Sequence, residues 1–283
     1  MFILKTARLL QSRLQTLRNN GLKIGFVPTM GALHAGHISL MERCKSENDI
    51  TVCSIFVNPK QFNDKSDLDK YPQPIEDDIK MLTAAGVDYL FHPSSDDLYN
   101  EDYTDEEIDL DGLDTMFEGA LRPGHFQGVA KVVKRFFEIV QPHNAYFGQK
   151  DFQQTVVLKT LIKNYDFNIN MVVCPIMREP NGLAMSSRNQ RLSPDERERA
   201  SFIYKSLLKL KERTRFKPLA ESLESSIKYL TSLKDAELEY LICVDGNTMQ
   251  EVKSLAEAEY VVALTVVKYG GVRLLDNIIL KQP

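Results

Sequence analysis

Short apolar runs alternate with amphipathic segments over the first 175 residues, and this alternation limits the possible folds more than any other feature of the sequence. Between the runs, apolar residues recur at helical spacing, most clearly over residues 129–140. Strands that alternate with helices predict an α/β fold, with a doubly wound parallel sheet that carries helices on both faces. The predicted buried strands are 24–27, 50–57, 87–91, 145–147 and 169–173.

The pattern changes after about residue 176. Ser193, Pro194 and Glu196 are typical of a helix start, and apolar residues from Ala200 to Leu208 give that helix a buried face. A second helix is predicted over 219–230, and Gly270-Gly271 predicts a tight turn between two late strands. Two helices and three strands predict a smaller C-terminal α+β domain, which divides the chain into residues 1–176 and 177–283. The three late strands are 237–244, 260–267 and 272–280.

The composition is typical of a folded globular protein. Of the 283 residues, 43% are hydrophobic and 26% are charged, and the formal net charge of −4 lacks the basic excess of a nucleic-acid binder. The four cysteines are scattered without a C-x-x-C pair, which favours reduced thiols. No apolar stretch approaches the length of a membrane span, and no signal-peptide pattern is found. We therefore expect a cytoplasmic protein that binds neither nucleic acid nor a membrane.

Two histidines three residues apart, His34 and His37, follow the first predicted strand in the segment PTMGALHAGH (28–37). The order of strand, glycine turn and helix places backbone N–H groups and both imidazoles at a helix N-terminus, where anions bind. Imidazole also donates hydrogen bonds to phosphate oxygens. A chance pair of surface histidines and a zinc site are the alternatives, but no cluster of further zinc ligands lies nearby. The context favours binding of a nucleotide phosphate.

Polar side chains follow other predicted strands as well. FVNPKQF (56–62) brings Asn58 and Gln61 to the end of the second strand, where they can hydrogen-bond a substrate, although Asn-Pro alone predicts only a loop. FGQKDFQQ (147–154) places Lys150 at a strand-to-helix turn, which favours a phosphate ligand over the usual solvated surface lysine. GLAMSSRN (182–189) supplies hydroxyls and Arg188, either as an anion-binding loop that closes over a ligand or as a plain linker. RPGHFQG (122–128) is interpreted as a turn and a helix start.

Together, these segments resemble the pantoate–β-alanine ligase (pantothenate synthetase) family. The resemblance rests on PTMGALHAGH, FVNPKQF, RPGHFQGVAKVV (122–133), FGQKDFQQ and GLAMSSRN, which occur in the family's order and cover both halves of the chain. The histidine pair is similar to the HIGH signature of nucleotidylyltransferases, and residues 185–188 are similar to their KMSKS loop. The resemblance implies a Rossmann-like nucleotide- and pantoate-binding domain over 1–176, a C-terminal α+β lid domain over 177–283, and a homodimer.

The family condenses (R)-pantoate with β-alanine to pantothenate through a pantoyl-adenylate intermediate, using ATP with Mg²⁺ and releasing AMP and pyrophosphate. The resemblance implies pantoate contacts at Gln61 and Gln154, and the position of Asn58 after the second strand makes it a further candidate. It also implies magnesium contacts at Asp77 and Asp78, which by themselves fit the acidic first turn of a helix. The resemblance assigns His37 as the acid. We expect the negative charge on the phosphates to be met by the predicted catalytic residues His34, His37, Lys150, Ser186, Ser187 and Arg188. The implied ATP contacts are Met30, Gly31, Ala32, Leu33, His34, Ala35, Gly36, His37, Gly148, Gln149, Lys150, Asp151, Met177, Met185, Ser186, Ser187 and Arg188.

Two other functions share parts of this pattern. A nucleotidylyltransferase that acts on a phosphate substrate has the same histidine pair and fold, and it makes a stable nucleotide product. A non-catalytic synthetase-like module binds RNA or a partner protein instead. The acidic balance of the chain and its complete set of His, Lys and Ser-Arg elements argue against the module.

Overall fold

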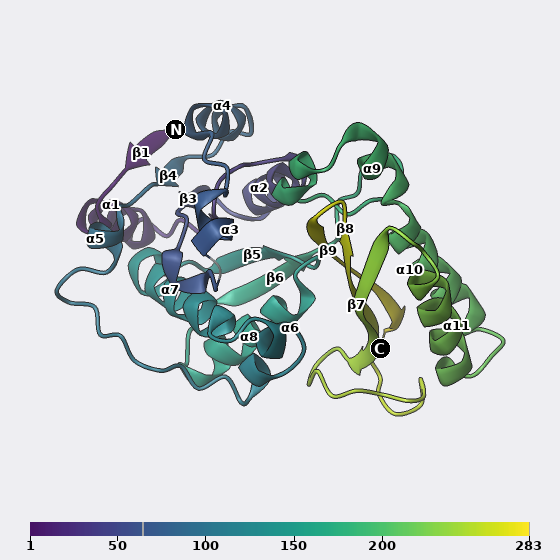
Figure 1. Ribbon diagram of the computed structural model, residues 1–283. Coiled ribbons are helices and arrows are strands. Elements are labelled where there is room, and N and C mark those ends of the chain that lie inside the picture. The colour runs from purple at the N-terminus through teal and green to yellow at the C-terminus, as the bar shows by residue number, and fades with distance from the viewer. Residues whose placement is uncertain (64, 283) are drawn as a thin grey trace. The chain divides into compact units, whose positions relative to one another are not determined.

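The computed structural model describes residues 1–63 and 65–282, which form two compact units (Figure 1). The first unit contains residues 1–149 and 153–174, and the second contains residues 150–152 together with the chain from residue 175 onward. Each unit has a sheet of its own. Over the described parts of the chain, none of the helices is both long enough and apolar enough to cross a membrane.

A parallel sheet of six strands forms the centre of the first unit, in the order β1-β4-β3-β2-β5-β6. This confirms the predicted α/β class, and each of the five predicted strands is present. The sequence offers no signal for β1, because its three residues are largely exposed and form no buried run. The strands are β1 (Phe2–Leu4), β2 (Ile24–Thr29), β3 (Ile50–Ile55), β4 (Tyr89–Phe91), β5 (Asn144–Gly148) and β6 (Asn170–Cys174).

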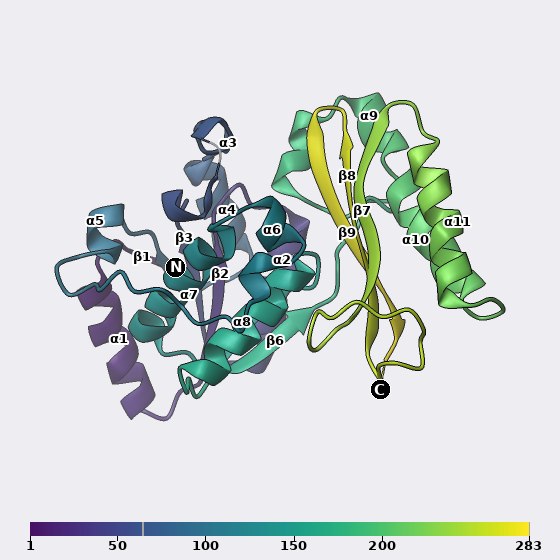
Figure 2. The same cartoon turned by 60° about the horizontal axis from the view of Figure 1, so that its bottom comes forward.

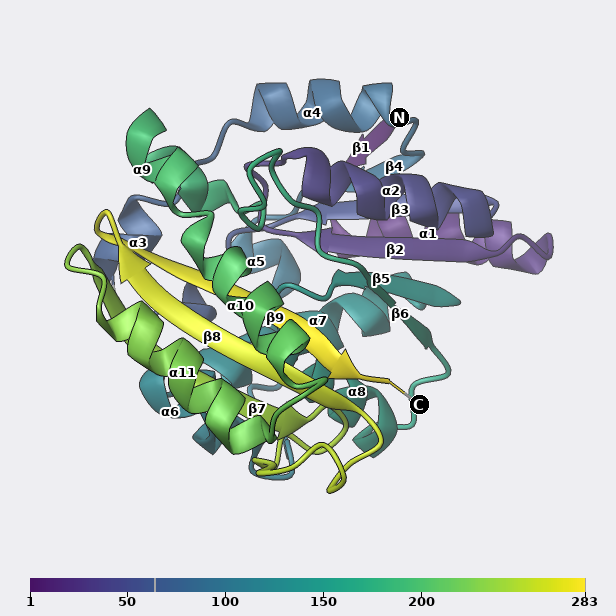
Figure 3. The same cartoon turned by 90° about the vertical axis from the view of Figure 1, so that its right-hand side faces the viewer.

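Helices cover both faces of this sheet, as the alternation predicts. Successive residues of a strand face opposite sides of the sheet. Phe26 of β2 packs against Phe136 of α7 on one face, whereas Val27 faces the other side and packs in a hydrophobic cluster with residues of α2 and α4 (Figure 3). Helix α1 packs against α7. The helical segments of this unit are α1 (Ala7–Asn19), α2 (Ala35–Glu47), η1 (Pro59–Gln61), α3 (Lys65–Asp69), α4 (Ile75–Ala84), α5 (Ser95–Leu98), η2 (Leu113–Thr115), α6 (Glu118–Leu121), α7 (His125–Val140) and α8 (Phe152–Asn164).

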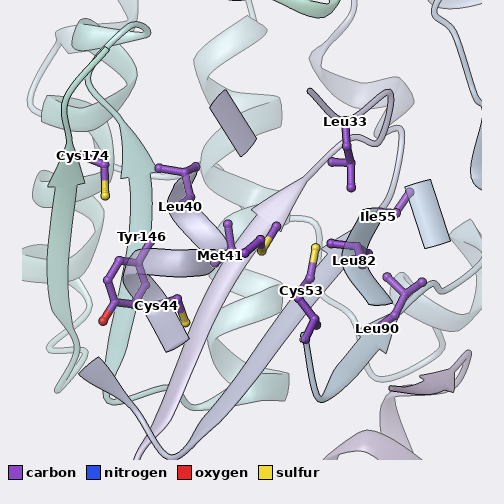
Figure 4. Close-up of a cluster of buried hydrophobic side chains, with 12 residues drawn as sticks. Leu33, Leu40, Met41, Cys44, Cys53, Ile55, Leu82, Leu90, Tyr146 and Cys174 are labelled. Carbon is purple, nitrogen blue, oxygen red and sulfur yellow. The ribbon is translucent and has the colours of Figure 1, made fainter. Parts of the chain in front are cut away.

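One hydrophobic cluster fixes α2 and α4 on the sheet (Figure 4). Met41 and Cys44 on α2 and Leu82 on α4 are fully buried there, together with Cys53 of β3. Burial raises the pKa of the Cys44 thiol to about 12, so this side chain packs as a neutral group. Because the cluster immobilises α2, it also fixes the position of the turn that precedes this helix.

The second unit contains an antiparallel three-stranded sheet, β7-β8-β9, with α10 and α11 packed on it (Figure 2). This confirms the predicted α+β class. Gly270 and Gly271 have φ values of 55° and 68°, and they form the predicted tight turn between β8 and β9. The elements are η3 (Ser187–Arg191), α9 (Pro194–Arg199), α10 (Phe202–Arg213), α11 (Leu219–Thr231), β7 (Ala236–Asp245), β8 (Val261–Tyr269) and β9 (Val272–Lys281).

The prediction of one continuous helix after Ser193 is wrong. Ser193 does cap a helix start, since its side chain accepts a hydrogen bond from the backbone N–H of Glu196. However, the chain bends near Ala200 and forms two helices, α9 and α10. At the bend the N–H of Ile203 donates to the carbonyl of Ala200, three residues back, at 3.2 Å. A three-residue bond tightens the helix and turns its axis, which the apolar spacing alone does not reveal.

Candidate active site

The sheet order brings the loops that follow β2, β3 and β5 next to one another. β2 lies between β3 and β5, and the chain reverses its direction of progress across the sheet at this point: β3, β4 and β1 extend to one side, and β5 and β6 to the other. In open parallel sheets, ligands bind at such a switch point, beside the carboxyl ends of the strands. Within the first unit, the segments concerned are residues 30–34 and 56–58 and Gln149.

The two histidines form a capping box at the start of α2. The Nδ1 atom of His34 accepts a hydrogen bond from the backbone N–H of Gly36 at 3.1 Å. In turn, the Nδ1 atom of His37 accepts from the backbone N–H of His34 at 3.3 Å. A neutral imidazole that accepts at Nδ1 carries its hydrogen on Nε2. The capping geometry therefore sets both rings, with centroids 4.1 Å apart, as Nε2–H donors at a helix N-terminus.

A buried carboxylate holds the turn before these histidines. Asp78, which is 2% exposed, accepts hydrogen bonds from the backbone N–H groups of Ala32 at 2.9 Å and Leu33 at 2.7 Å. Burial raises the pKa of Asp78, although the two backbone hydrogen bonds oppose this effect. Ala32 adopts the uncommon φ of 50° and Gly31 a φ of 81°, which is how successive N–H groups come to point toward one acceptor.

Asp77 and Asp78, the predicted magnesium contacts, lie in different environments. The side chain of Asp77 is 72% exposed and pairs with Lys80 at 2.8 Å, while both oxygens of Asp78 accept backbone hydrogen bonds. In the described part of the chain, no group of three or more His, Cys, Asp or Glu side chains is arranged to hold a metal ion. A magnesium role for this pair stays a prediction.

A buried hydrogen-bond network positions the loop that follows β3. The amide nitrogen of Asn58 donates to the carbonyl of Gly128 on α7 at 3.0 Å, and its oxygen accepts from the hydroxyl of Tyr99 at 3.0 Å. Gln61 lies beside Met30, with 2.9 Å between its amide nitrogen and the Met30 sulfur. The structure thus brings a predicted pantoate contact together with a predicted ATP contact.

His125 supports the same loop, a role that sequence reasoning missed. Its Nδ1 atom lies 2.8 Å from the backbone oxygen of Gln61, and its Nε2 atom lies 3.1 Å from a guanidinium nitrogen of Arg122. Because a carbonyl only accepts and a guanidinium only donates, the ring carries its hydrogen on Nδ1. The segment RPGHFQG opens α7, as its interpretation as a helix start predicts, but no local pattern reveals the bond to residue 61.

The remaining predicted residues are distributed over both units. Gln154 is half-buried on α8 of the first unit. Lys150 belongs to the second unit and lies 3.4 Å from the carboxylate of Asp151. Residues 177–185 form a hairpin in which Met185 N–H donates to Met177 O at 2.9 Å. The hairpin leads into η3, where Ser186 accepts from the N–H of Arg188. The convergence of these residues with the histidine turn stays a prediction.

A parallel sheet with a histidine-capped helix at its switch point places this chain among the doubly wound α/β proteins. The family model described as pantoate-beta-alanine ligase matches residues 2–279. The chain therefore belongs to the pantoate–β-alanine ligase family.

Relatives and solved structures agree with this assignment. The chain is 46% identical over 282 residues to a pantothenate synthetase of Bacteroides fragilis, with 100% of both chains covered. It is 42% identical to that of Acetivibrio thermocellus, covering 99% of this chain and 100% of the relative. The pantothenate synthetase of Thermus thermophilus superposes with a TM-score of 0.92 at 37% identity, covering 99% and 100%. A pantoate-β-alanine ligase of Francisella tularensis, complexed with β,γ-ATP and β-alanine, gives 0.80 at 37% identity, covering 99% and 98%.

Proposed function

We propose that this enzyme condenses (R)-pantoate with β-alanine at the expense of ATP, through a pantoyl adenylate. The observation that carries the proposal is the family match over residues 2–279. The Francisella tularensis ligase, whose structure is complexed with β,γ-ATP and β-alanine, supports the choice of substrates. ATP and β-alanine are then small-molecule substrates of this chain, and pantoate is the acid that is activated.

The reaction needs activation because a carboxylate oxygen is a poor leaving group. The pantoate carboxylate attacks the α-phosphorus of ATP, so that a new oxygen–phosphorus bond forms and pyrophosphate leaves. The amine of β-alanine then attacks the acyl carbon, AMP leaves, and the amine loses a proton. Negative charge builds on the α-phosphoryl oxygens and on pyrophosphate during the first step, so donors aimed at these atoms lower its barrier.

The predicted catalytic residues suit that charge. The Nε2–H groups of His34 and His37 stand at a helix N-terminus, where the helix dipole favours an anion. Lys150 and Arg188 supply full positive charges, and Ser186 and Ser187 supply hydroxyl donors. We propose that these six side chains meet the triphosphate together, with the N-terminal domain binding the nucleotide and pantoate and the C-terminal domain acting as the lid.

Pantoate is held by neutral amides in this proposal. Gln61 and Gln154 can hydrogen-bond its hydroxyls and carboxylate, and Asn58 fixes the loop that carries Gln61. A neutral amide orients the attacking carboxylate without pairing it to a cation, which would weaken its attack. The short distance between Gln61 and Met30 supports a pantoate position next to the nucleotide.

Magnesium enters the proposal as part of the Mg-ATP substrate. Mg²⁺ commonly binds through phosphates and one or two carboxylates, keeping several waters, so it does not need a site built wholly from protein. Bound to the phosphates, the ion offsets their negative charge. We also propose that this enzyme is a cytoplasmic homodimer.

A time course with ATP and pantoate, without any amine, tests this function. We expect pyrophosphate release to stop near one equivalent per active site, with acyl adenylate retained on the enzyme. A soluble dinucleotide-type product would favour the nucleotidylyltransferase. Absence of ATP binding combined with tight RNA binding would favour the non-catalytic module.

A further inference from the structure

A buried ion pair lies at the base of the 177–185 hairpin in the second unit. Asp276 on β9 is 4% exposed, and both of its carboxylate oxygens accept hydrogen bonds from the guanidinium of Arg178, at 2.7 and 2.8 Å. The guanidinium carbon also stands 3.5 Å from the ring centroid of Tyr204 on α10. Bidentate pairing and stacking together fix the orientation of a planar guanidinium.

Arg178 connects the two arms of the hairpin. Its backbone pairs with Ala184 in an antiparallel bridge, and its side chain donates to the carbonyl of Gly182 at 3.1 Å. The hairpin runs directly into Ser186–Arg188, the residues that the proposed function assigns to the triphosphate. A rotation of the Arg178 side chain would therefore move the start of that segment.

The neighbouring residue of β9 holds the other predicted phosphate ligand. The side-chain amide of Asn277, which is 2% exposed, donates to the backbone carbonyl of Lys150 at 2.9 Å. The backbone N–H of Asn277 donates to Asp276 at 2.7 Å. Two adjacent residues of one strand thus fix Arg178 on one side and the main chain of Lys150 on the other.

We propose that Arg178, Asp276 and Asn277 are positioning residues for adenylate formation, which hold the Lys150 backbone and the 177–188 segment in one fixed arrangement. This inference rests on the proposed function, because it needs Lys150 and residues 186–188 to meet the triphosphate. None of the three positioning side chains has to touch ATP. A displacement of catalytic groups by about 1 Å costs on the order of 100-fold in rate. A substitution that lets the positioned segments shift is therefore expected to slow the reaction strongly.

Burial explains why the ion pair between Arg178 and Asp276 tolerates little change. Burial raises the pKa of Asp276, and the hydrogen bonds and charge of Arg178 oppose that shift. A buried carboxylate that loses its guanidinium is left without a counter-charge, so the strand and the hairpin must rearrange around it. Arg178→Lys keeps the positive charge but loses the bidentate and stacking geometry, which makes it the informative change.

The test compares Arg178→Lys and Asn277→Leu with Arg273→Lys. Arg273 also extends from β9, but it pairs with Glu239 on β7 at 2.6 Å and so serves as the matched control. For the first two variants, we expect pantoate-dependent pyrophosphate release to fall 10- to 100-fold in kcat, with the KM for pantoate unchanged within twofold. For the control, we expect kcat within twofold at a comparable fall in melting temperature. If Arg178→Lys and Asn277→Leu lose no more kcat than the control, the inference is overturned.

A double-mutant cycle with Asn277→Leu and Lys150→Ala distinguishes positioning of Lys150 from a general loss of stability. Asn277 is proposed to act through Lys150, so Asn277→Leu should cost little further rate once Lys150→Ala is present. Independent, multiplicative losses would overturn the inference. If Lys150→Ala itself keeps the wild-type rate, the proposed function of Lys150 fails. If Lys150→Ala loses the rate while Asn277→Leu and Arg178→Lys keep it, the positioning inference alone fails.

Discussion

Two buried aspartates support two predicted nucleotide-binding segments, and they do so with different partners. In the first unit, Asp78 accepts hydrogen bonds from the backbone N–H groups of Ala32 and Leu33. In the second unit, Asp276 accepts two hydrogen bonds from the guanidinium of Arg178. Both carboxyl groups are almost fully buried, and burial raises the pKa of each.

The backbone of each supported segment explains the difference. The turn at residues 31–33 uses positive φ values, so its N–H groups point outward together and are available to an acceptor. In the hairpin, backbone groups pair with each other instead, as in the bond from Glu179 N–H to Leu183 O at 2.8 Å. A carboxylate can hold a turn through its main chain, whereas a hairpin that has used its own N–H groups needs a side chain to reach the carboxylate.

Removing one predicted catalytic donor from each unit should have the largest effect. We expect His37→Ala and Lys150→Ala each to slow pantoate-dependent pyrophosphate release by about 10²–10³-fold, because each removes a donor that we propose meets the developing charge. Melting temperatures within a few degrees of wild type are the control that the fold is kept. A rate within a few-fold of wild type for either variant would remove that residue from the catalytic set.

Asp78→Ala should have the next largest effect. The change leaves the N–H groups of Ala32 and Leu33 without their acceptor, and each orphaned buried donor costs about 1–3 kcal/mol. We expect the free energy of unfolding, measured in urea, to fall by about 2–4 kcal/mol. The matched control is Asp77→Ala, whose exposed side chain should change stability by no more than about 0.5 kcal/mol. Equal effects of the two substitutions would show that Asp78 does not support the turn.

Gly31→Ala probes the packing of the first turn against Asp78. A Cβ at Gly31 would lie 2.9 Å from Asp78 Oδ2, and the backbone has a φ of 81°. The left-handed backbone alone costs about 1–2 kcal/mol for alanine. Gly21 has a φ of 79°, and a Cβ added there would meet no atom within 4 Å, so Gly21→Ala isolates that backbone cost. We expect Gly31→Ala to destabilise the protein by roughly 1 kcal/mol more than Gly21→Ala does. Equal losses of stability for the two variants would mean that the Asp78 side chain moves aside without cost.

The pH dependence of stability should give the smallest effect. The pKa of Asp78 is raised above its ordinary value of 3.8, so the folded protein holds this proton to a higher pH than the unfolded chain does. Stability relative to Asp78→Asn, which cannot titrate here, is therefore greatest below about pH 4 and falls as the pH rises through the raised value. Urea unfolding over the range from about pH 3.5 to about pH 7 measures this difference. A difference that grows with pH would contradict the direction of the pKa shift.

The sequence predicts those parts of the molecule that depend on local patterns. Alternating apolar runs predict the strands β2 to β6, and the Gly-His segment predicts a helix N-terminus, which the capping box at the start of α2 confirms. The tight turn at Gly270-Gly271 is likewise readable, because the left-handed backbone at both positions favours glycine.

Long-range contacts are the parts that the sequence does not predict. Asp78 is read as an acidic residue in the first turn of a helix, and nothing nearby indicates that its oxygens bind a backbone 45 residues away. Arg178 and Asp276 are 98 residues apart, and His125 reaches a carbonyl 64 residues away. Each such contact depends on how the elements pack, so a pattern within one segment carries no signal for it.

Transfer of a carboxylate oxygen from the acid to AMP tests whether this enzyme activates an organic acid as its AMP ester. Pantoate labelled with ¹⁸O in its carboxylate is converted completely in the presence of ATP and β-alanine, and the products are analysed by mass spectrometry. We predict one ¹⁸O atom in each AMP and none in pyrophosphate, because a carboxylate oxygen stays on phosphorus when the amine displaces AMP. Unlabelled AMP would contradict activation through an adenylate.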